Sequence, residues 1–454
     1  MSHEFETGGV FDRIKESNAA DGAVRRAFIK TFGCQMNARD SETIAGMLVK
    51  MGYFLTGREE AADLIVYNTC CVRENAENRI FGNLGALRNL KRANPRLLIA
   101  VCGCMPQQDA ALDRIKRENR HVDLVFGTFN LHRFPEMLLD IIESNGRAYD
   151  VWKSRDPAEF TRRAEPVRKS PYKSGVNIMY GCDNFCSYCI VPYVRGGERS
   201  RPSADILKEA EGLAADGVAE AMLLGQNVNS YGKGLGGNES FPGLLSRVAG
   251  INGLRRIRFM TSHPKDLSDG LIDVIASHEN ICKHIHLPMQ SGSDRVLRLM
   301  NRGYTRGLYL GLINRIRERI PDCAITTDII VGFPGETEED FADTLDMVEK
   351  IRFDGVFTFQ YSRRTGTPAA GLDGQVSRKT TGVRFRSLVD MINPILLEKN
   401  EKYVGRTALV MAEEGGKGRT DGNALVHFTG RAAPGAIVNV RVTGCKTFYL
   451  TGEI

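Results

Sequence analysis

Residues 180–190 read Tyr-Gly-Cys-Asp-Asn-Phe-Cys-Ser-Tyr-Cys-Ile and place Cys182, Cys186 and Cys189 at spacings of four and three. One loop with this spacing can bring three thiolates to a single metal corner, and thiolates suit zinc, copper(I) and iron–sulfur clusters. The usual cluster motifs supply four cysteines. Three ligands leave one metal with an open position, as in sites that bind a substrate. The alternative is a structural zinc site completed by a distant Cys or His.

The composition is that of a long chain without secretory features. Its 454 residues exceed one ordinary hydrophobic core, so roughly two to four domains are expected. The net charge of +6 is compatible with nucleic acid but is weak evidence for it. Eleven cysteines in a chain of this length indicate metal or redox work in a reducing compartment. Met1 to Asn18 does not resemble a signal peptide, and no apolar run is long enough to span a membrane, so we expect a cytoplasmic protein.

Short β-branched and apolar runs alternate with helical patterns between residues 26 and 142. This alternation predicts a doubly wound α/β domain, in which helices cover both faces of a parallel sheet. The predicted strands are residues 26–31, 63–68, 97–101 and 124–126. We read residues 1–25 as a flexible N-terminus and residues 143–173, rich in prolines and basic side chains, as an extended linker.

Cysteines stand at the ends of three of these predicted strands. Cys34 follows the first, Cys70 and Cys71 follow the second, and Cys102 and Cys104 end the third. Ligands of such sheets bind beyond the carboxyl ends of the strands, so we expect a second three-thiolate site there. The alternative is that these are buried packing residues, since free cysteine is common in protein cores. Spacing alone leaves open which cysteine of each pair takes part.

The segment from residue 174 to about 395 contains six strand-like runs with helical stretches between them. This pattern predicts a partial (β/α)6 barrel whose site lies at the carboxyl ends of its strands. Glycines and small polar residues follow the strands, where they can let backbone approach a ligand or simply form turns. We read His263 and His286 as hydrogen-bonding or packing residues, because neither belongs to a pair with metal-ligand spacing. These strand-end motifs are residues 224–229, 261–265, 287–292, 328–336 and 361–368.

The pattern changes at about residue 396. Four short strand-like runs separated by glycine-rich turns predict a small antiparallel β-barrel over residues 396–454. Barrels of this kind often bind RNA through basic and aromatic side chains. A structural cap is the alternative. The candidate side chains are Lys417, Arg419, His427, Phe428, Arg431, Arg441, Lys446, Phe448 and Tyr449.

Several of these motifs resemble one known family. Cys-x3-Cys-x2-Cys with Tyr188 before its last cysteine is similar to the radical S-adenosylmethionine (SAM) motif. The phrases Gly-Cys-Gln-Met-Asn, Asn-Thr-Cys-x-Val-Arg-Glu and Gly-Cys-Met resemble the N-terminal domain of the radical SAM methylthiotransferases. In that family the matching ligands are Cys34, Cys70 and Cys104, which makes Cys71 and Cys102 packing residues. Gln-Met-Asn after the first cysteine is the form of the MiaB-type tRNA-modifying branch.

The resemblance covers residues 26–454 and implies a methylthiotransferase N-terminal domain (26–142), a radical SAM core (174–395) and a TRAM domain (396–454). It implies two 4Fe-4S clusters, one on each cysteine triad, and SAM near Tyr188, Gly225, Gln226, Asn227 and Gln290. The implied reaction is methylthiolation of carbon-2 of N6-isopentenyladenosine beside the tRNA anticodon, by a monomer served by a low-potential donor such as flavodoxin or ferredoxin. The alternatives are a sister enzyme acting on threonylcarbamoyladenosine or a ribosomal-protein aspartate, and a non-catalytic metal-bearing RNA-binding protein.

Overall fold

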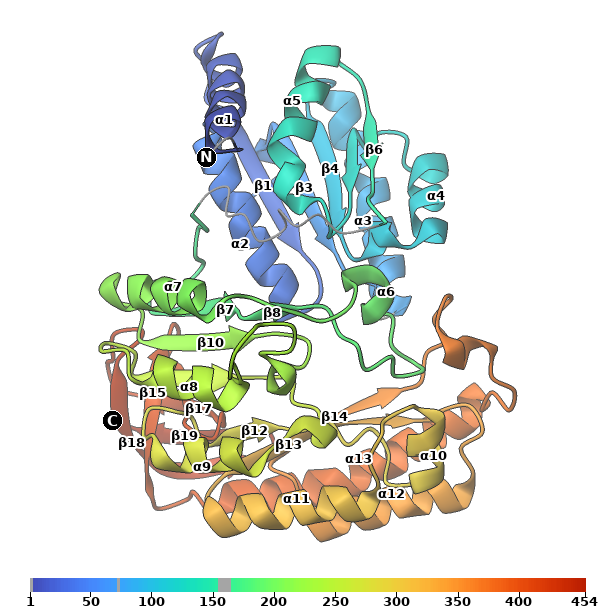
Figure 1. Cartoon of the computed structure of the whole chain (residues 1–454), viewed down its shortest axis with the longest axis vertical. Coiled ribbons are helices and arrows are strands. Elements are labelled where there is room, and N and C mark those ends of the chain that lie inside the picture. The colour runs from blue at the N-terminus through green and yellow to red at the C-terminus, as the bar shows by residue number, and fades with distance from the viewer. Residues whose placement is uncertain (1–2, 72–73, 154–164) are drawn as a thin grey trace. The chain divides into compact units, whose positions relative to one another are not determined.

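A computed structural model of the chain describes residues 3–71, 74–153 and 165–454 (Figure 1). The chain forms two units, one of Met1–Lys169 with Ile190–Gly196 and one of Ser170–Cys189 with Gly197–Ile454. Arg155, Pro157, Arg162 and Arg163 of the predicted linker lie outside the described residues. Within the described ranges, no helix combines the length and the apolar composition that crossing a membrane requires.

The first unit is built on a six-stranded sheet in which every pair of neighbours is parallel. Its order is β2-β1-β3-β4-β5-β6, and all six residues of β3 are buried, as expected for a strand covered on both faces. The predicted parallel sheet is confirmed. The strands are β1 (Arg26–Thr31), β2 (Phe54–Leu55), β3 (Leu64–Thr69), β4 (Leu98–Gly103), β5 (Leu124–Phe126) and β6 (Ala148–Asp150).

Helices pack on both faces of this sheet. On one face α1 (His3–Ala19), α2 (Gln35–Lys50) and α5 (Phe134–Ser144) share a core, and on the other lie α3 (Glu74–Ala93) and α4 (Asp109–Glu118). The expectation of a flexible N-terminus is wrong for α1, because Phe11 and Ile14 are buried in the core with α2. These two residues stand three apart, so they share one face of a helix whose other residues are mostly polar.

The predicted linker is shorter than residues 143–173. Residues 148–150 form the edge strand β6, and Lys173 begins a strand of the second unit. Between them, residues 165–167 run along α2, where the backbone nitrogen of Val167 donates a hydrogen bond to Glu42. A Cβ atom on Gly46 would overlap the carbonyl oxygen of Glu165, so this part of the connection lies directly on the helix.

Six parallel strands organise the central part of the second unit. They form two three-stranded sheets, β11-β10-β7 and β12-β13-β14, linked by a parallel bridge between Ile257 and Ile281. The predicted partial (β/α)6 arrangement is confirmed. The strands are β7 (Lys173–Asn177), β10 (Glu220–Leu224), β11 (Arg256–Phe259), β12 (His284–His286), β13 (Ala324–Val331) and β14 (Gly355–Gln360), and the helices are α7 (Ser203–Ala215), α8 (Phe241–Ala249), α9 (Asp269–Ser277), α10 (Asp294–Leu299), α11 (Arg306–Arg319), α12 (Glu338–Ile351) and α13 (Arg378–Glu401).

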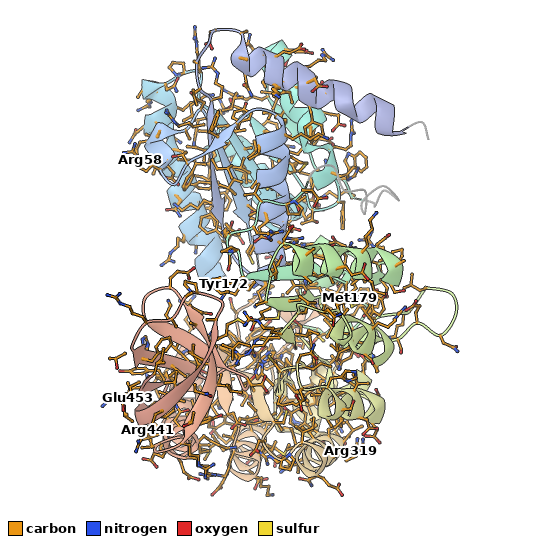
Figure 2. All side chains as sticks on the ribbon, turned by 90° about the vertical axis from the view of Figure 1, so that its left-hand side faces the viewer. Arg58, Tyr172, Met179, Arg319, Arg441 and Glu453 are labelled. Atoms are coloured by element: carbon orange, nitrogen blue, oxygen red, sulfur yellow. The ribbon has the colours of Figure 1, made fainter. Side chains whose placement is uncertain are left out.

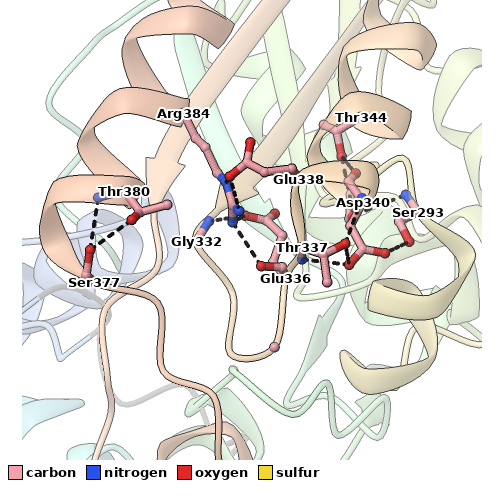
Figure 3. A network of polar contacts seen from close by, with 12 residues as sticks. Ser293, Gly332, Glu336, Thr337, Glu338, Asp340, Thr344, Ser377, Thr380 and Arg384 are labelled. Carbon is pink, nitrogen blue, oxygen red and sulfur yellow. Dashed lines mark hydrogen bonds and ion pairs between the residues drawn. The ribbon is translucent and has the colours of Figure 1, made fainter.

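The Gly-Phe-Pro-Gly-Glu loop after β13 is closed by its own glutamate. Glu336 accepts hydrogen bonds from the Gly332 backbone nitrogen at 2.7 Å and from Arg384 of α13 at 2.8 Å (Figure 3). Gly332 has φ +74°, and a Cβ there would overlap the Thr381 side chain. The close backbone approach at this glycine is therefore to α13.

The tail forms a closed five-stranded barrel in the order β15-β16-β17-β19-β18. Its pairs are antiparallel except β17–β19, which is parallel. Of the aromatic candidates, Phe428 belongs to the barrel core, whereas Phe448 is 70% exposed. Arg441 and Glu453 stand opposite each other in the register of β18 and β19, and both lie on the outside of the barrel (Figure 2). The strands are β15 (Thr407–Glu413), β16 (Lys417–Thr420), β17 (Leu425–Thr429), β18 (Ile437–Lys446) and β19 (Tyr449–Glu453).

Two buried arginines of β11 fix the barrel to the central strands. Arg258 donates to the carbonyl oxygens of Thr420 and Asp421 at 2.7 and 2.9 Å and pairs with Glu220 at 2.9 Å. Arg256 donates to the carbonyls of Leu409 and Arg419. The barrel is therefore built into the second unit.

Replacing Arg258 with methionine should lower the free energy of unfolding by about 3–5 kcal/mol, because the Glu220 carboxylate, whose side chain is only 12% exposed, is left without its cation. Urea unfolding followed by circular dichroism measures the change. The control is Arg441→Met on the exposed barrel wall, expected within about 0.5 kcal/mol of the parent. Equal urea midpoints for the two variants would show that Arg258 does not stabilise the contact between the barrel and the central strands.

Candidate functional site

Cys34, Cys70 and Cys104 follow β1, β3 and β4, which are neighbours in the sheet. Cys70 and Cys104 are each 4% exposed, and Cys34 is exposed at the start of α2. Gly33 has φ +102°, and a Cβ on it would lie 2.5 Å from the Cys70 Cβ, so only glycine lets these two loops come so close. The strand ends thus bring the three predicted thiols together.

Asn37, from the Gln-Met-Asn motif, stands between these loops. Its side-chain nitrogen donates to the carbonyl oxygens of Phe32 and Thr69, both at 2.8 Å, and so ties the ends of β1 and β3 together. Its side-chain oxygen lies 3.9 Å from the Cys34 sulfur and 3.8 Å from the Cys104 sulfur. Asn37 belongs to the Gln-Met-Asn motif, but the sequence does not predict its contacts at the site.

A buried arginine completes this arrangement. Arg195 ends the short helix α6 (Val191–Arg195), which belongs to the first unit, and is 5% exposed. Its Nε lies 3.3 Å from the Cys104 sulfur, and its Nη2 donates to Asn37 at 2.5 Å and to Asp40 at 2.7 Å. Burial raises the pKa of the Cys104 thiol to about 12, although Arg195 opposes this shift. No pattern in the sequence predicts that Arg195 lies at this site.

Cys71 and Cys102 occupy apolar surroundings on opposite faces of the sheet. Cys71 packs in the core formed with α3 and α4, and Cys102 packs in the core formed with α1, α2 and α5. Burial is the main cause that raises the pKa of Cys102 well above its ordinary value. These places support the interpretation of both as packing residues.

The loop of Cys182, Cys186 and Cys189 follows β8 (Met179–Tyr180) in the second unit. The buried Arg302 donates to the Cys186 sulfur at 3.4 Å and to the Pro288 carbonyl at 2.9 Å. Asn184 donates to the Cys182 sulfur at 3.4 Å. Each cysteine triad therefore has one buried arginine whose guanidinium contacts one of its sulfurs.

The same loop is pinned to the end of α10. Ser187 donates through its backbone nitrogen to Met300 and through its hydroxyl to Leu299. Phe185 has φ +46°, and Asn301 donates to its carbonyl at 3.1 Å. Tyr188 packs against the cluster of Val296, Met300, Phe333 and Ala369. These contacts hold the backbone between the cysteines in one conformation.

Within the described residues, buried polar atoms without a hydrogen-bond partner gather at the carboxyl ends of the central strands. An unmet buried polar group costs about 1–3 kcal/mol. A series of them at the strand ends therefore fits a polar ligand such as SAM. They belong to Asn177 at the end of β7, Asn227 and Asn229 after β10, Ser262 and His263 after β11, Gln290 after β12 and Tyr361 after β14.

The predicted SAM-contact positions differ in what they offer. Asn227 and Gln290 each present an unpartnered oxygen within the described part of the chain, and Gln290 has φ +68°, a strained conformation for a residue other than glycine. Gly225 is explained by packing, because a Cβ there would lie 2.5 Å from the Met179 Cγ. Gln226 is half-buried beside them.

His263 is a further polar group at this edge. Its Nδ1 accepts a hydrogen bond from the Lys265 backbone nitrogen at 3.3 Å, so the ring proton resides on Nε2. Burial, with nearby Arg302, lowers the pKa of His263 to about 2, which keeps the ring neutral. It therefore offers a neutral N–H donor, as its hydrogen-bonding interpretation expected.

The cysteines of each triad are near one another in the fold, but their side chains are not arranged to hold a single metal ion. In the part of the chain that the structure describes, no three His, Cys, Asp or Glu side chains are close enough to share one metal ion. None of the eleven cysteines, all of which lie in the described ranges, forms a disulfide. Three soft thiolates in each triad fit an iron–sulfur cluster by donor chemistry.

The comparisons with known proteins first define the class. Residues 176–348 match the Radical SAM superfamily, and residues 26–127 match the Uncharacterized protein family UPF0004. The radical SAM methyltransferase TsrM from Kitasatospora setae has a similar fold, with a TM-score of 0.55 and 16% identity over 77% of each chain. The cobalamin-dependent radical enzyme OxsB gives 0.52 with 12% identity, over 82% of this chain and 56% of that one. The chain is a radical SAM enzyme, a class that uses SAM and a 4Fe-4S cluster.

Two relatives then define the family. A protein of Alkaliphilus oremlandii (strain OhILAs) is 52% identical over 95% of this chain and 93% of its own length. One of Acetivibrio thermocellus is 50% identical over 98% of this chain and 94% of its own. Both are named tRNA-2-methylthio-N(6)-dimethylallyladenosine synthase. This chain belongs to their family, the MiaB-type radical SAM methylthiotransferases.

Proposed function

We propose that this enzyme methylthiolates carbon-2 of N6-isopentenyladenosine next to the anticodon of tRNA. The observation that carries the proposal is identity of about half of all residues, over nearly the whole chain, to synthases named for that product. The Gln-Met-Asn sequence after Cys34 favours the same branch over the sister enzymes that act on threonylcarbamoyladenosine or a ribosomal-protein aspartate. We place the reaction in the cytoplasm, where its tRNA substrate is modified.

Cys182, Cys186 and Cys189 would hold the cluster that binds SAM. When bound, the cluster and SAM together supply a radical able to take hydrogen from the unactivated C2–H bond. Acid–base groups have no means to remove this hydrogen. Arg302 and Asn184 would hold the thiolates in place through the N–H groups that they direct at sulfur. The unpartnered oxygens of Asn227 and Gln290 and the neutral N–H of His263 would orient the polar parts of SAM.

We further propose a second 4Fe-4S cluster on Cys34, Cys70 and Cys104, with the open iron of that cluster as the seat of the sulfur to be transferred. The support is the convergence of three thiols from neighbouring strand ends and the tight loop at Gly33. Three protein ligands leave one position free for an incoming group. The enzyme would act as a monomer and receive electrons from a low-potential donor such as flavodoxin or ferredoxin.

Nucleoside mass spectrometry of tRNA from a deletion strain tests the function. The 2-methylthio form should disappear and N6-isopentenyladenosine should accumulate in its place, with recovery on complementation by the intact gene. Loss of the methylthio group from threonylcarbamoyladenosine, or from a ribosomal-protein aspartate, with the isopentenyl form unchanged would assign the enzyme to a sister branch.

A further inference from the structure

Arg195 comes from a distant part of the sequence and reaches the N-terminal cysteines. It stands 91 positions after Cys104, yet its Nε lies 3.3 Å from that sulfur. The helix that carries it is anchored in the first unit, where Ile190 and Val194 are buried in the core with α3 and α4. The Val194 carbonyl also accepts a hydrogen bond from Thr128 at 2.6 Å. These contacts fix the backbone of the helix, and the fixed backbone places the Arg195 guanidinium at the cysteines.

We propose that Arg195 is a positioning residue of the N-terminal site, which fixes the Cys104 thiolate and offsets the negative charge of a cluster held by Cys34, Cys70 and Cys104. This rests on the second cluster of the proposed function. A 4Fe-4S cluster with three thiolates is negative and gains another negative charge on reduction. A buried cation beside a ligand sulfur stabilises the reduced form more than the oxidised one.

The bonding pattern favours a guanidinium at this position. Arg195 directs separate N–H groups at sulfur, at the Asn37 oxygen and at the Asp40 carboxylate, all from one plane. Lysine would supply the charge but not this planar fork. Because Asn37 also bonds the ends of β1 and β3, Arg195 is linked through it to the other two cysteine loops.

Arg195 also lies close in the sequence to the cysteine loop of the SAM site. Cys189, the last cysteine of the SAM-site loop, precedes it by only six residues. Cys189 belongs to the second unit and Ile190 begins the segment that belongs to the first. One short stretch of chain thus supplies a ligand residue for one site and the positioning arginine for the other.

The test uses the full-length chain with Cys182, Cys186 and Cys189 all changed to alanine, so that only the N-terminal cluster assembles. Its reduction potential is measured by a redox titration followed by electron paramagnetic resonance, with iron content determined on the same samples. In this background Arg195→Gln should shift the equilibrium toward the oxidised cluster about tenfold, which is about 59 mV for one electron. Arg195→Lys should recover part of the shift. The matched control, Arg302→Gln, should leave the potential unchanged.

The outcomes separate the two proposals. An unchanged potential in Arg195→Gln protein that retains its iron would overturn the role of Arg195 and leave the proposed function standing. If Arg195→Gln protein loses its iron, the titration is made on Arg195→Met, which also removes the charge, and an unchanged potential there would overturn the role. No iron in the parent with Arg195 intact would overturn the second cluster, and this inference with it.

Discussion

Changing Cys186 to alanine abolishes formation of 5′-deoxyadenosine from SAM. Cys186 is 7% exposed and accepts the N–H of Arg302, so the change removes one of three ligands and leaves a buried cation facing a gap. Two thiolates do not hold a cluster with one open iron. We expect loss of about four irons per chain and a rate at background. The measurement is anaerobic turnover of reconstituted enzyme, with 5′-deoxyadenosine quantified by mass spectrometry.

A matched control lies in the same unit. Cys323 is also buried, in the central apolar core, and Cys323→Ala makes the same chemical change away from the loop. It should keep its iron and most of its rate, at the cost of a slightly lower unfolding midpoint. Continued formation of 5′-deoxyadenosine by the Cys186 variant would contradict the ligand assignment.

The second large effect separates the two cysteine triads. Cys70→Ala and Cys104→Ala should still cleave SAM, because the loop of Cys182, Cys186 and Cys189 is untouched. Neither should yield methylthiolated tRNA, because the sulfur to be transferred has no seat. Following 5′-deoxyadenosine and the modified nucleoside in one reaction measures both activities.

Neighbouring cysteines provide the controls for this prediction. Cys71→Ala and Cys102→Ala change buried side chains in the two apolar cores and should leave product formation largely intact. The comparison of Cys102 with Cys104 is the sharper one, because both stand at the end of β4 and both are buried. Methylthiolated product from the Cys70 variant, or its loss only in the Cys71 variant, would show that the wrong cysteine had been chosen.

Most of the fold and site that could be predicted from the sequence followed from regular strand patterns and from cysteine spacing. β1 and β5 occur over the predicted residues, because alternating or continuous apolar runs report burial directly. The strands β2, β6 and β16 were missed, because β2 has only two residues and β6 and β16 contain charged side chains instead of a continuous apolar run. α1 was missed because a few apolar residues in a mostly polar stretch give little periodic signal.

The parts of the site that depend on tertiary contacts were out of reach. Arg195 and Arg302 look like ordinary surface arginines in sequence, and only their burial against sulfur distinguishes them. Glycine was ambiguous for the same reason: Gly33 brings two cysteine loops together, whereas Gly332 and Gly225 make room for neighbouring side chains. A sequence lists such residues without saying what lies beside them.

The division of the chain also limits how this protein can be taken apart. The first unit is not one continuous stretch, because it takes back Ile190–Gly196 after the chain has entered the second unit at Ser170. A fragment ending at Lys169 would keep Cys34, Cys70 and Cys104 but would expose to water the core surface that Ile190 and Val194 cover. A cut at Lys169, by protease or by gene truncation, therefore cannot release an intact N-terminal module. A cut after Gly196 keeps the whole first unit but takes Ser170–Cys189 away from the second, so recombination that exchanges such modules must carry this seven-residue return along.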